Sequence, residues 1–274
     1  MYCLQLTIKP TAAMTFRMIP GSILNIATYP FVPPTSLSGF LRRLTMMKAG
    51  IDIPETKINK EKPPTYLLPP DYITLGAYPT FSEWNGIHRT YRKGMREFNH
   101  DDFSKLVIQG KGKDFQLHTW EYFFAEQLTG FVVSSSAEKL EALSAVEGFG
   151  CYIGKEGYAY VEQISDVIEM QEEQCAAAPS TVIPADDLIR NSQWHGGCDI
   201  YNLYHYRWQQ EAYKQSEETG VWGEEPTAVN GFIPFTGAYY TDPSNHPVLN
   251  YWTDQDNIFI PSSLIRLLSR NDEN

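Results

Sequence analysis

The opening of the chain alternates apolar and polar residues, and this alternation predicts a β-strand. In the run YCLQLTIK, residues 2–9, leucine and isoleucine recur at every second position, with glutamine, threonine and lysine between them. A period of two places alternate side chains on opposite faces of a sheet. We therefore expect the fold to begin with a strand that has one buried face.

The next pattern has helical spacing and lies in TYPFVPPTSLSGFLRRL, residues 28–44. Its three prolines disfavour helical geometry, so we expect a helix that begins after Pro34 with Thr35 or Ser36 as its N-cap. Apolar residues then recur at i, i+3, i+4 and i+7, which makes one face of this helix part of the core. These residues are Leu37, Phe40, Leu41 and Leu44.

The middle of the chain predicts a long excursion and then regular structure. Residues 51–113 are rich in proline, lysine and glycine, whereas residues 115–135 have the aromatic and β-branched content of one or two strands. Ser135 and Glu138 form a capping-box pattern that predicts a second short helix containing Leu140, Leu143 and Val146. Two apolar runs joined by Gly-Lys-Glu-Gly at residues 154–157 are typical of a hairpin.

Strand, helix, strands, helix and strand is the order of a ferredoxin-like β-α-β-β-α-β unit. We therefore expect an α+β protein in which residues 1–175 form a ferredoxin-like domain, similar in architecture to an RNA-recognition motif. Many folds unrelated to RNA share this architecture. Residues 176–274 carry many tyrosines and predict an irregular C-terminal extension that packs on the first domain or on a partner.

Length and cysteine usage narrow the class of protein. The 274 residues contain no run of about 20 apolar residues, and the start lacks a signal-type pattern, so we expect a cytoplasmic protein without a membrane partner. The four cysteines form no CxxC pair, which argues against a disulfide framework and a cysteine zinc site and predicts buried thiols. They are Cys3, Cys151, Cys175 and Cys198.

The net charge of −11 argues against a protein that coats nucleic acid non-specifically. The charge is uneven, however, because residues 162–173 are strongly acidic while residues 89–96 hold four cations and no acid. The spacing of these cations suits one side of a helix or a flexible arm, so a local nucleic-acid site is compatible with the overall charge. The cations are Arg89, Arg92, Lys93 and Arg96.

We expect no metal and no cofactor. His195, Cys198 and His205 match no standard zinc spacing, and neither a GxxxxGK[ST] nor a GxGxxG phosphate-binding loop occurs. The acid pairs at 101–102 and 186–187 are interpreted as turn and helix-start residues, not as general acid–base pairs.

The polar side of the helix after Pro34 carries Thr35, Gly39, Arg42 and Arg43. A glycine inside a helix costs about 1 kcal/mol relative to alanine, so a compensating role is expected. A glycine beside two arginines near a helix N-terminus suits a closely approaching phosphate or backbone. The alternative is an ordinary solvated face with a tolerated glycine.

A metal-independent ribonuclease would need a base for the 2′-hydroxyl proton and a cation for the phosphate. His88 and His118 flank the basic stretch, with Tyr91 and Lys93 close by in sequence. The alternative for both histidines is a hydrogen-bonded structural role.

Several of these pieces together resemble the CRISPR-associated Cas-five family of the repeat-associated RNA-binding superfamily. They are the opening strand, Phe16-Arg17 in the following loop, TYPFVPPTSLSGFLRRL, EYFFAEQLTGFVVSS and YIGKEGYAYVEQI. The resemblance covers about residues 1–165, and no comparable match follows residue 175.

The resemblance implies a non-enzymatic subunit of a type I, Cascade-like surveillance complex. In that family the ferredoxin-like domain carries an inserted thumb, binds the 5′ handle of the crRNA, and caps the backbone filament against the Cas-seven subunit and the large subunit; target DNA is met through the complex. The excursion at 51–113 lies where that thumb belongs. Candidate RNA-contacting residues are Arg17, Ser36, Ser38, Gly39, Arg42, Arg43, Arg89, Arg92, Lys93 and Arg96.

One branch of the family processes crRNA with a tyrosine, a lysine and a histidine. The adjacent lysine–histidine pair of that branch is missing, since Leu117 precedes His118 and Ile87 precedes His88. We therefore favour the binding role and keep the ribonuclease as the second hypothesis. A third is a ferredoxin-like interaction module unrelated to CRISPR.

Overall fold

The computed structural model describes residues 1–18, 25–51, 67–80, 82–95, 115–194, 197–206 and 232–269, without the side chains of 91–95 and 115–118. Within these ranges the protein is mixed α+β, with mostly antiparallel sheets and few helices. In the same ranges, no helix is long and apolar enough to span a bilayer.

The main sheet belongs to the N-terminal half, and all its strand pairs are antiparallel. Its order is β3 (Ile73–Pro79), β6 (Leu128–Ser134), β1 (Tyr2–Pro10), β8 (Gly157–Ile164) and β7 (Gly150–Ile153), with β9 (Ile168–Glu169) also pairing with β1.

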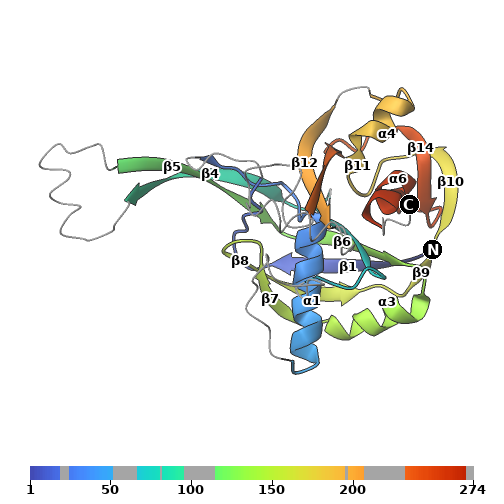
Figure 1. Ribbon diagram of the computed structural model, residues 1–274, viewed down its shortest axis with the longest axis horizontal. Coiled ribbons are helices and arrows are strands. Elements are labelled where there is room, and N and C mark those ends of the chain that lie inside the picture. The colour runs from blue at the N-terminus through green and yellow to red at the C-terminus, as the bar shows by residue number, and fades with distance from the viewer. Residues whose placement is uncertain are drawn as a thin grey trace, which may run out of the picture.

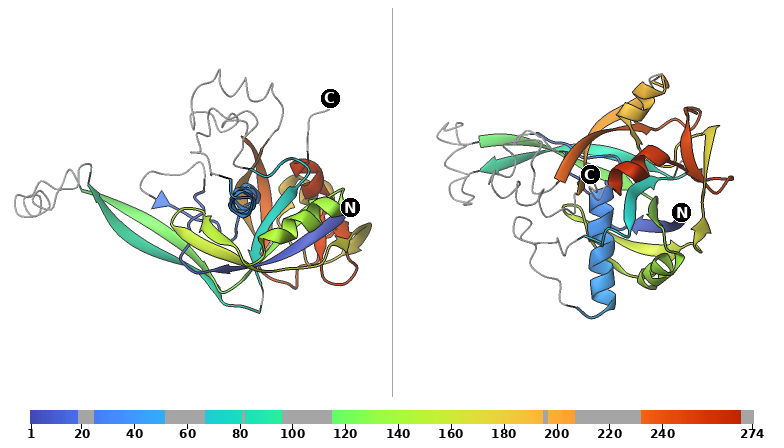
Figure 2. Two further views of the ribbon diagram at one scale, coloured as in Figure 1. Left: turned by 90° about the horizontal axis from the view of Figure 1, so that it is seen from below. Right: turned by 45° about the vertical axis from the view of Figure 1, so that its right-hand side comes forward.

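Helix α1 (Pro34–Lys48) joins β1 to β3, and α3 (Ala137–Leu143) with the 3₁₀ turn η2 (Ser144–Val146) joins β6 to the β7–β8 hairpin. Both helices lie on one side of the sheet (Figure 2). Without β7, the chain order of this sheet is strand, helix, strand, strand, helix, strand.

The local patterns of the first strand and helix are confirmed. Alternate β1 residues are fully buried, and so is the apolar face of α1. The expected helix start is wrong, because α1 begins at Pro34 itself, after Pro33, with no side-chain cap. Proline suits the first helical position, where its φ is already helical and its missing N–H would be unpaired anyway.

The second helix and the hairpin are also where the sequence predicts them. Leu140, Leu143 and Val146 are buried, and β7 and β8 are joined by a turn at residues 154–156. The cap is displaced by one residue from the prediction, since Ser136, not Ser135, accepts the backbone N–H of Lys139.

The excursion expected at 51–113 is wrong in part. Strand β3 lies within it and is a mostly buried member of the main sheet, because its apolar residues pair with β6. The short run ITLGAYP is difficult to recognise as a strand in the sequence, because the segments around it are rich in proline and glycine.

A hairpin of β4 (Asn85–Met95) and β5 (Phe115–Ala125) follows β3, with β2 (Asn25–Ile26) parallel to β5. The hairpin projects away from the body of the protein (Figure 1).

The C-terminal extension is not irregular. In the part that the structure describes, it contributes to two antiparallel three-stranded sheets, the first of which starts with β10 just before it; sequence periodicity misses these sheets because their strands are distant in the chain. The first sheet is β10 (Gln171–Ala176), β14 (Val248–Thr253) and β15 (Phe259–Pro261). The second is β11 (Ile183–Pro184), β13 (Phe232–Tyr240) and β12 (Cys198–Tyr206), and the helices are α4 (Ala185–Arg190) and α6 (Ser262–Leu268).

An aromatic cluster joins the two halves into one core. Phe31 lies with its ring centroid 5.2 Å from that of Tyr78, 5.5 Å from Tyr201 and 5.0 Å from Tyr239. Tyr29 also contacts Tyr201, at 5.6 Å, and its hydroxyl donates to the carbonyl of Asn202. The aromatic residues that precede α1 therefore fix the start of this helix against β3, β12 and β13.

Candidate nucleic-acid interface

The polar side of α1 is half-buried along its length. Thr35, Ser36, Gly39, Arg42 and Arg43 are each neither fully exposed nor buried. The C-terminal part of this helix packs on β7. Two cations of the helix face that region. Burial raises the pKa of Cys151 to about 11, and the charge of Arg43 opposes this rise. Lys48 lies 5.1 Å from the centroid of the Phe149 ring.

Ser38 has a structural role in this arrangement. Its side chain is buried, and its hydroxyl accepts the backbone N–H of Leu68 at 2.9 Å. On the same side, the Thr74 hydroxyl donates to the carbonyl of Pro34 at 2.9 Å. Ser38 therefore holds the segment before β3 against α1, and we remove it from the candidate RNA contacts.

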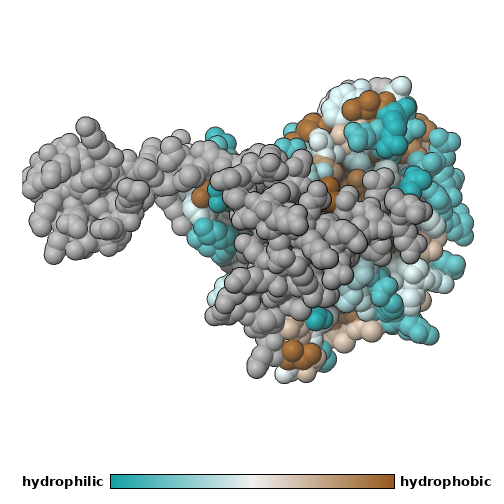
Figure 3. Space-filling view, viewed as in Figure 1, coloured by the Kyte–Doolittle hydropathy of each residue, from teal (hydrophilic) through white to brown (hydrophobic). Residues whose placement is uncertain are grey.

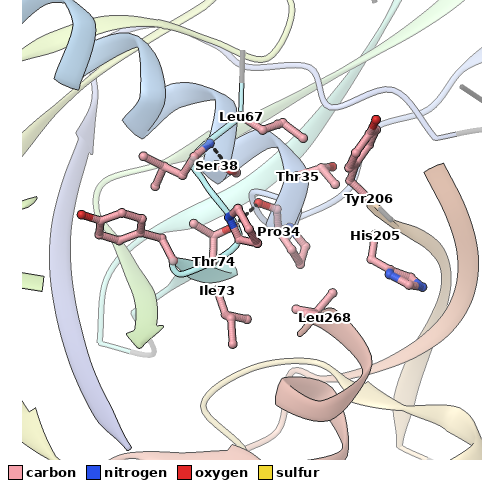
Figure 4. A pocket seen from close by; sticks show the side chains of 12 residues that line it. Pro34, Thr35, Ser38, Leu67, Ile73, Thr74, His205, Tyr206 and Leu268 are labelled. Atoms are coloured by element: carbon pink, nitrogen blue, oxygen red, sulfur yellow. Dashed lines mark hydrogen bonds between the residues drawn. The ribbon is translucent and has the colours of Figure 1, made fainter. Parts of the chain in front are cut away.

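A small cavity lies beside these contacts, between α1, the segment before β3, β12 and α6 (Figure 4). Its volume is about 50 Å³, and Thr35, Thr74, His205 and Tyr206 are among the residues that line it. Pockets for small ligands have volumes of several hundred Å³, so this cavity is of a size for water and not for a nucleotide.

The basic stretch forms a strand and not a helix as far as residue 95. In the β4–β5 register, Arg89 lies opposite Glu121 and Arg92 opposite His118. The helical alternative for this stretch is therefore wrong over that range. The side chains of Tyr91, Arg92, Lys93 and His118, and the whole of Arg96, lie outside the described residues.

Arg89 is the one cation of the stretch whose side chain is described, and it is paired with Glu121. Its Nε and Nη2 donate to Glu121 Oε1 at 2.9 and 2.5 Å. The Glu121 side chain is only 8% exposed, whereas that of Arg89 is 61% exposed. Sequence reasoning missed Glu121, although an acid within the aromatic run TWEYFF is a signal that it has a buried partner.

Other contacts hold the base of the hairpin. The Lys155 ammonium lies 4.1 Å from the centroid of the Trp120 ring, and the Tyr122 hydroxyl donates to Glu156 Oε2 at 3.2 Å. Lys155 and Glu156 belong to the β7–β8 turn. This turn was predicted from its glycines, but its contact with the hairpin was not.

The structure therefore places the candidate RNA contacts in two groups. One is the polar side of α1, and the other is the β4–β5 hairpin together with Arg17, which is exposed and pairs through its backbone with Thr28. The β7–β8 hairpin connects the groups, because β7 packs on α1 and the turn contacts Trp120.

The acidic residues lie elsewhere. Glu172 and Glu173 are exposed on β10, which is on the opposite side of the protein from the projecting hairpin (Figure 1). Hydrophilic side chains cover that side of the surface (Figure 3). The negative net charge is thus partly separated in space from the basic hairpin.

The described residues contain no cluster of three or more metal-ligating side chains. Of the three residues considered, Cys198 is half-buried, His205 is buried, and His195 lies outside the described part. His88 is exposed on β4.

The predictions for the remaining acids and for the cysteines are confirmed in part. Asp186 and Asp187 occupy the first turn of α4, as predicted, whereas residues 101–102 are outside the described range. All four cysteines are free; Cys3 and Cys151 are buried, but Cys175 and Cys198 are only half-buried.

No protein-family model matches the sequence, and no curated protein matches it. Among solved structures, the protein is similar to a CRISPR protein from Archaeoglobus fulgidus, with 12% identity and a TM-score of 0.41 over 95% of this chain and 99% of that one. It is also similar to a chain of the type III-B Cmr-beta complex bound to cognate target RNA, with 10% identity and a TM-score of 0.42 over 98% and 90% of the two chains. These structural neighbours are CRISPR proteins.

Proposed function

We propose that this protein is a non-enzymatic, RNA-binding subunit of a type I CRISPR effector complex in the cytoplasm. In this role it holds the 5′ handle of the crRNA and caps the backbone filament against the Cas-seven and large subunits, and it meets target DNA only through the complex. The sequence resemblance of residues 1–165 to the Cas-five family supports this proposal, as does the strand and helix order of a ferredoxin-like unit.

The observation that carries the proposal is the projecting β4–β5 hairpin. It leaves the body between β3 and β6, within the part of the chain where the family has its thumb. Arg92 and Lys93 lie on its strand β4, and Arg96 follows directly in the sequence. Cations along a projecting arm suit the backbone of single-stranded RNA.

The local placement of charge is compatible with this role. An assembled subunit needs only a basic strip where the RNA passes, because the affinity of the complex is shared among its subunits. The exposed acids of β10 lie away from that strip.

The choice of binding over ribonuclease activity rests on the missing lysine–histidine pair of the processing branch, and the hairpin register adds that the two histidines are separated. His88 lies opposite Tyr122, while His118 lies opposite Arg92. The two histidine positions are thus four residues apart along the hairpin, roughly 13 Å at the rise of a β-strand. A shared acid–base pair needs groups within hydrogen-bond reach of one substrate hydroxyl.

The test is to express the protein together with the products of its neighbouring genes, purify it, and sequence the RNA that co-purifies. We expect RNA of defined length that begins with one common 5′ sequence. An assembled complex that lacks such RNA would overturn the proposal. Recovery of the protein without CRISPR subunits would favour the unrelated interaction module.

A further inference from the structure

The base of the β4–β5 hairpin is held on both of its faces. On one face, Trp120 and Tyr122 contact Lys155 and Glu156 of the β7–β8 turn. On the other face, the side chain of Glu121 turns inward, because neighbouring residues of a strand point to opposite sides. The hairpin is therefore anchored before it leaves the body of the protein.

Glu121 joins three segments of the chain through its two carboxylate oxygens. Oε1 accepts both Arg89 donors from β4, and Oε2 accepts the backbone N–H of Thr28 at 3.2 Å. Thr28 is fully buried, and its hydroxyl accepts the backbone N–H of Phe16 at 2.8 Å. A carboxylate that is almost excluded from water interacts strongly with its partners, and the loss of one partner leaves a buried charge uncompensated.

Thr28 leads directly into the start of α1. The next residues, Tyr29 and Phe31, are fixed in the aromatic cluster, and α1 begins at Pro34. Glu121 thus connects the hairpin to the helix that carries the other group of candidate RNA contacts. The hydrogen bonds of Glu121 to Arg89 and to Thr28, and that of Thr28 to Phe16, are all buried or partly buried.

We propose that Glu121 is a positioning residue that sets the direction of the β4–β5 hairpin relative to α1. Its effect on RNA rests on the proposed function: the basic hairpin and the polar side of α1 are held at a fixed separation, so that one RNA strand contacts both. Such pre-organisation raises affinity without any contact from Glu121 to the RNA.

The first measurement is independent of RNA. Spin labels at Gln116 on β5 and at Glu141 on α3, in a background with Cys175 and Cys198 replaced by serine, report the distance between the hairpin and the body. We expect a narrow distribution in the unmutated background and a clearly broader one in Glu121→Gln. Glu126→Gln removes the same charge from an exposed position just after β5 and should leave the distribution unchanged. An unchanged distribution in Glu121→Gln overturns the inference.

The second measurement is a salt titration of RNA binding. Glu121→Gln should weaken binding about tenfold at every salt concentration, with an unchanged slope, because no phosphate contact is lost. Glu126→Gln should bind as the unmutated protein does. Two results would overturn the proposed effect of Glu121 on RNA binding. One is a changed slope of affinity against salt, and the other is full RNA affinity despite a broader distance distribution.

A third variant covers the case in which Glu121→Gln does not fold. Arg89→Lys keeps the positive charge but loses the paired donation to Oε1, and should show the same broadening to a smaller degree. An unbroadened distribution in a folded Arg89→Lys protein overturns the inference. If the unmutated complex binds no RNA, the proposed function fails, while the distance measurement still decides whether Glu121 positions the hairpin.

Discussion

The side chain of Tyr78 receives the backbone N–H of Val182 at 3.2 Å on its hydroxyl oxygen, across 104 residues of sequence. The same hydroxyl donates to the carbonyl of Leu75 at 2.8 Å. Val182 is fully buried, so its N–H has no access to water. One phenol thus joins the main sheet to the C-terminal half at the edge of their shared aromatic cluster.

Tyr78→Phe should destabilise the protein by about 1–3 kcal/mol, because it leaves a buried N–H without its partner. The measurement is the free energy of unfolding in denaturant. Tyr152→Phe is the matched control, since Tyr152 is 66% exposed, and it should change stability by less than about 0.5 kcal/mol. Equal effects of the two variants would contradict the role assigned to Tyr78.

Ser38→Ala should also lower stability, by about 1–3 kcal/mol, because the backbone N–H of Leu68 loses its acceptor in a buried place. Ser36→Ala is the comparison, because Ser36 lies two residues earlier on the half-buried side of α1. It should have little effect on stability. RNA affinity should be unchanged in a folded Ser38→Ala protein. A loss of RNA binding in a stable Ser38→Ala protein would return Ser38 to the RNA contacts.

Reversal of Arg92 and Arg96 to glutamate should weaken RNA binding and reduce its salt dependence. Each phosphate contact contributes about −0.7 to the log–log slope for single strands, so a reduction of about one to two units is expected. The loss should be similar for correct and scrambled handles, because phosphate contacts carry no base information. Arg190→Glu with Arg266→Glu makes the same charge change at exposed positions on α4 and α6 and should leave the slope unchanged.

Purified protein should leave a CRISPR repeat RNA intact in the presence of a chelator. The lysine–histidine pair of the processing branch is missing from the sequence, and His88 and His118 lie four residues apart along the hairpin. The measurement is product formation on a denaturing gel over hours, with an unrelated RNA as control. Specific cleavage that disappears in His88→Ala or His118→Ala would instead establish the ribonuclease.

The four thiols should fall into two classes of reactivity toward a disulfide reagent. Burial, with a smaller contribution from Asp254, raises the pKa of Cys3 to about 12, so at pH 8 it is almost entirely protonated and unreactive in the folded state. Cys175 and Cys198 are half-buried and should react with a disulfide reagent well before Cys3 and Cys151 do. Reducing agent should not change the melting temperature, and a marked drop would contradict the free thiols.

The same thiol gives a pH dependence with a definite sign. The pKa of Cys3 is raised in the folded state, so its contribution to stability is complete below the ordinary value of 9.0 and is lost as pH rises toward about 12. Cys3→Ala should therefore reduce the alkaline loss of stability in that window. An identical pH profile in the variant would contradict the burial of an un-ionised thiol.

The parts of the fold that the sequence predicts are those encoded by neighbouring residues. The alternation in β1, the apolar face of α1 and the glycines of the β7–β8 turn each depend on spacings of a few residues. Strand β3 and the C-terminal sheets depend on partners far along the chain, such as the pairing of Gln171 with Thr253. No local period reports that kind of pairing.

In the candidate site, too, the sequence predicts what neighbouring residues encode and misses contacts between distant segments. The basic residues are visible in the sequence as a charge cluster, but the pairing of Arg89 with Glu121 depends on the register of two strands separated by 32 residues. Likewise, the place of Lys155 over Trp120 depends on how two hairpins meet. Composition therefore indicates where cations gather, and only tertiary structure decides which of them are already neutralised.

The shared aromatic core has a consequence for synthesis of the protein on the ribosome. Phe31 is translated long before its partner Tyr239, and before Ile260 and Ile265, which are buried in the same core. At about 5–20 residues per second, the N-terminal sheet waits on the order of 10 s or more for the surface that completes it. During that interval the nascent chain presents an uncovered aromatic face, to which we expect chaperones to bind until Tyr239 and the residues around it have been translated.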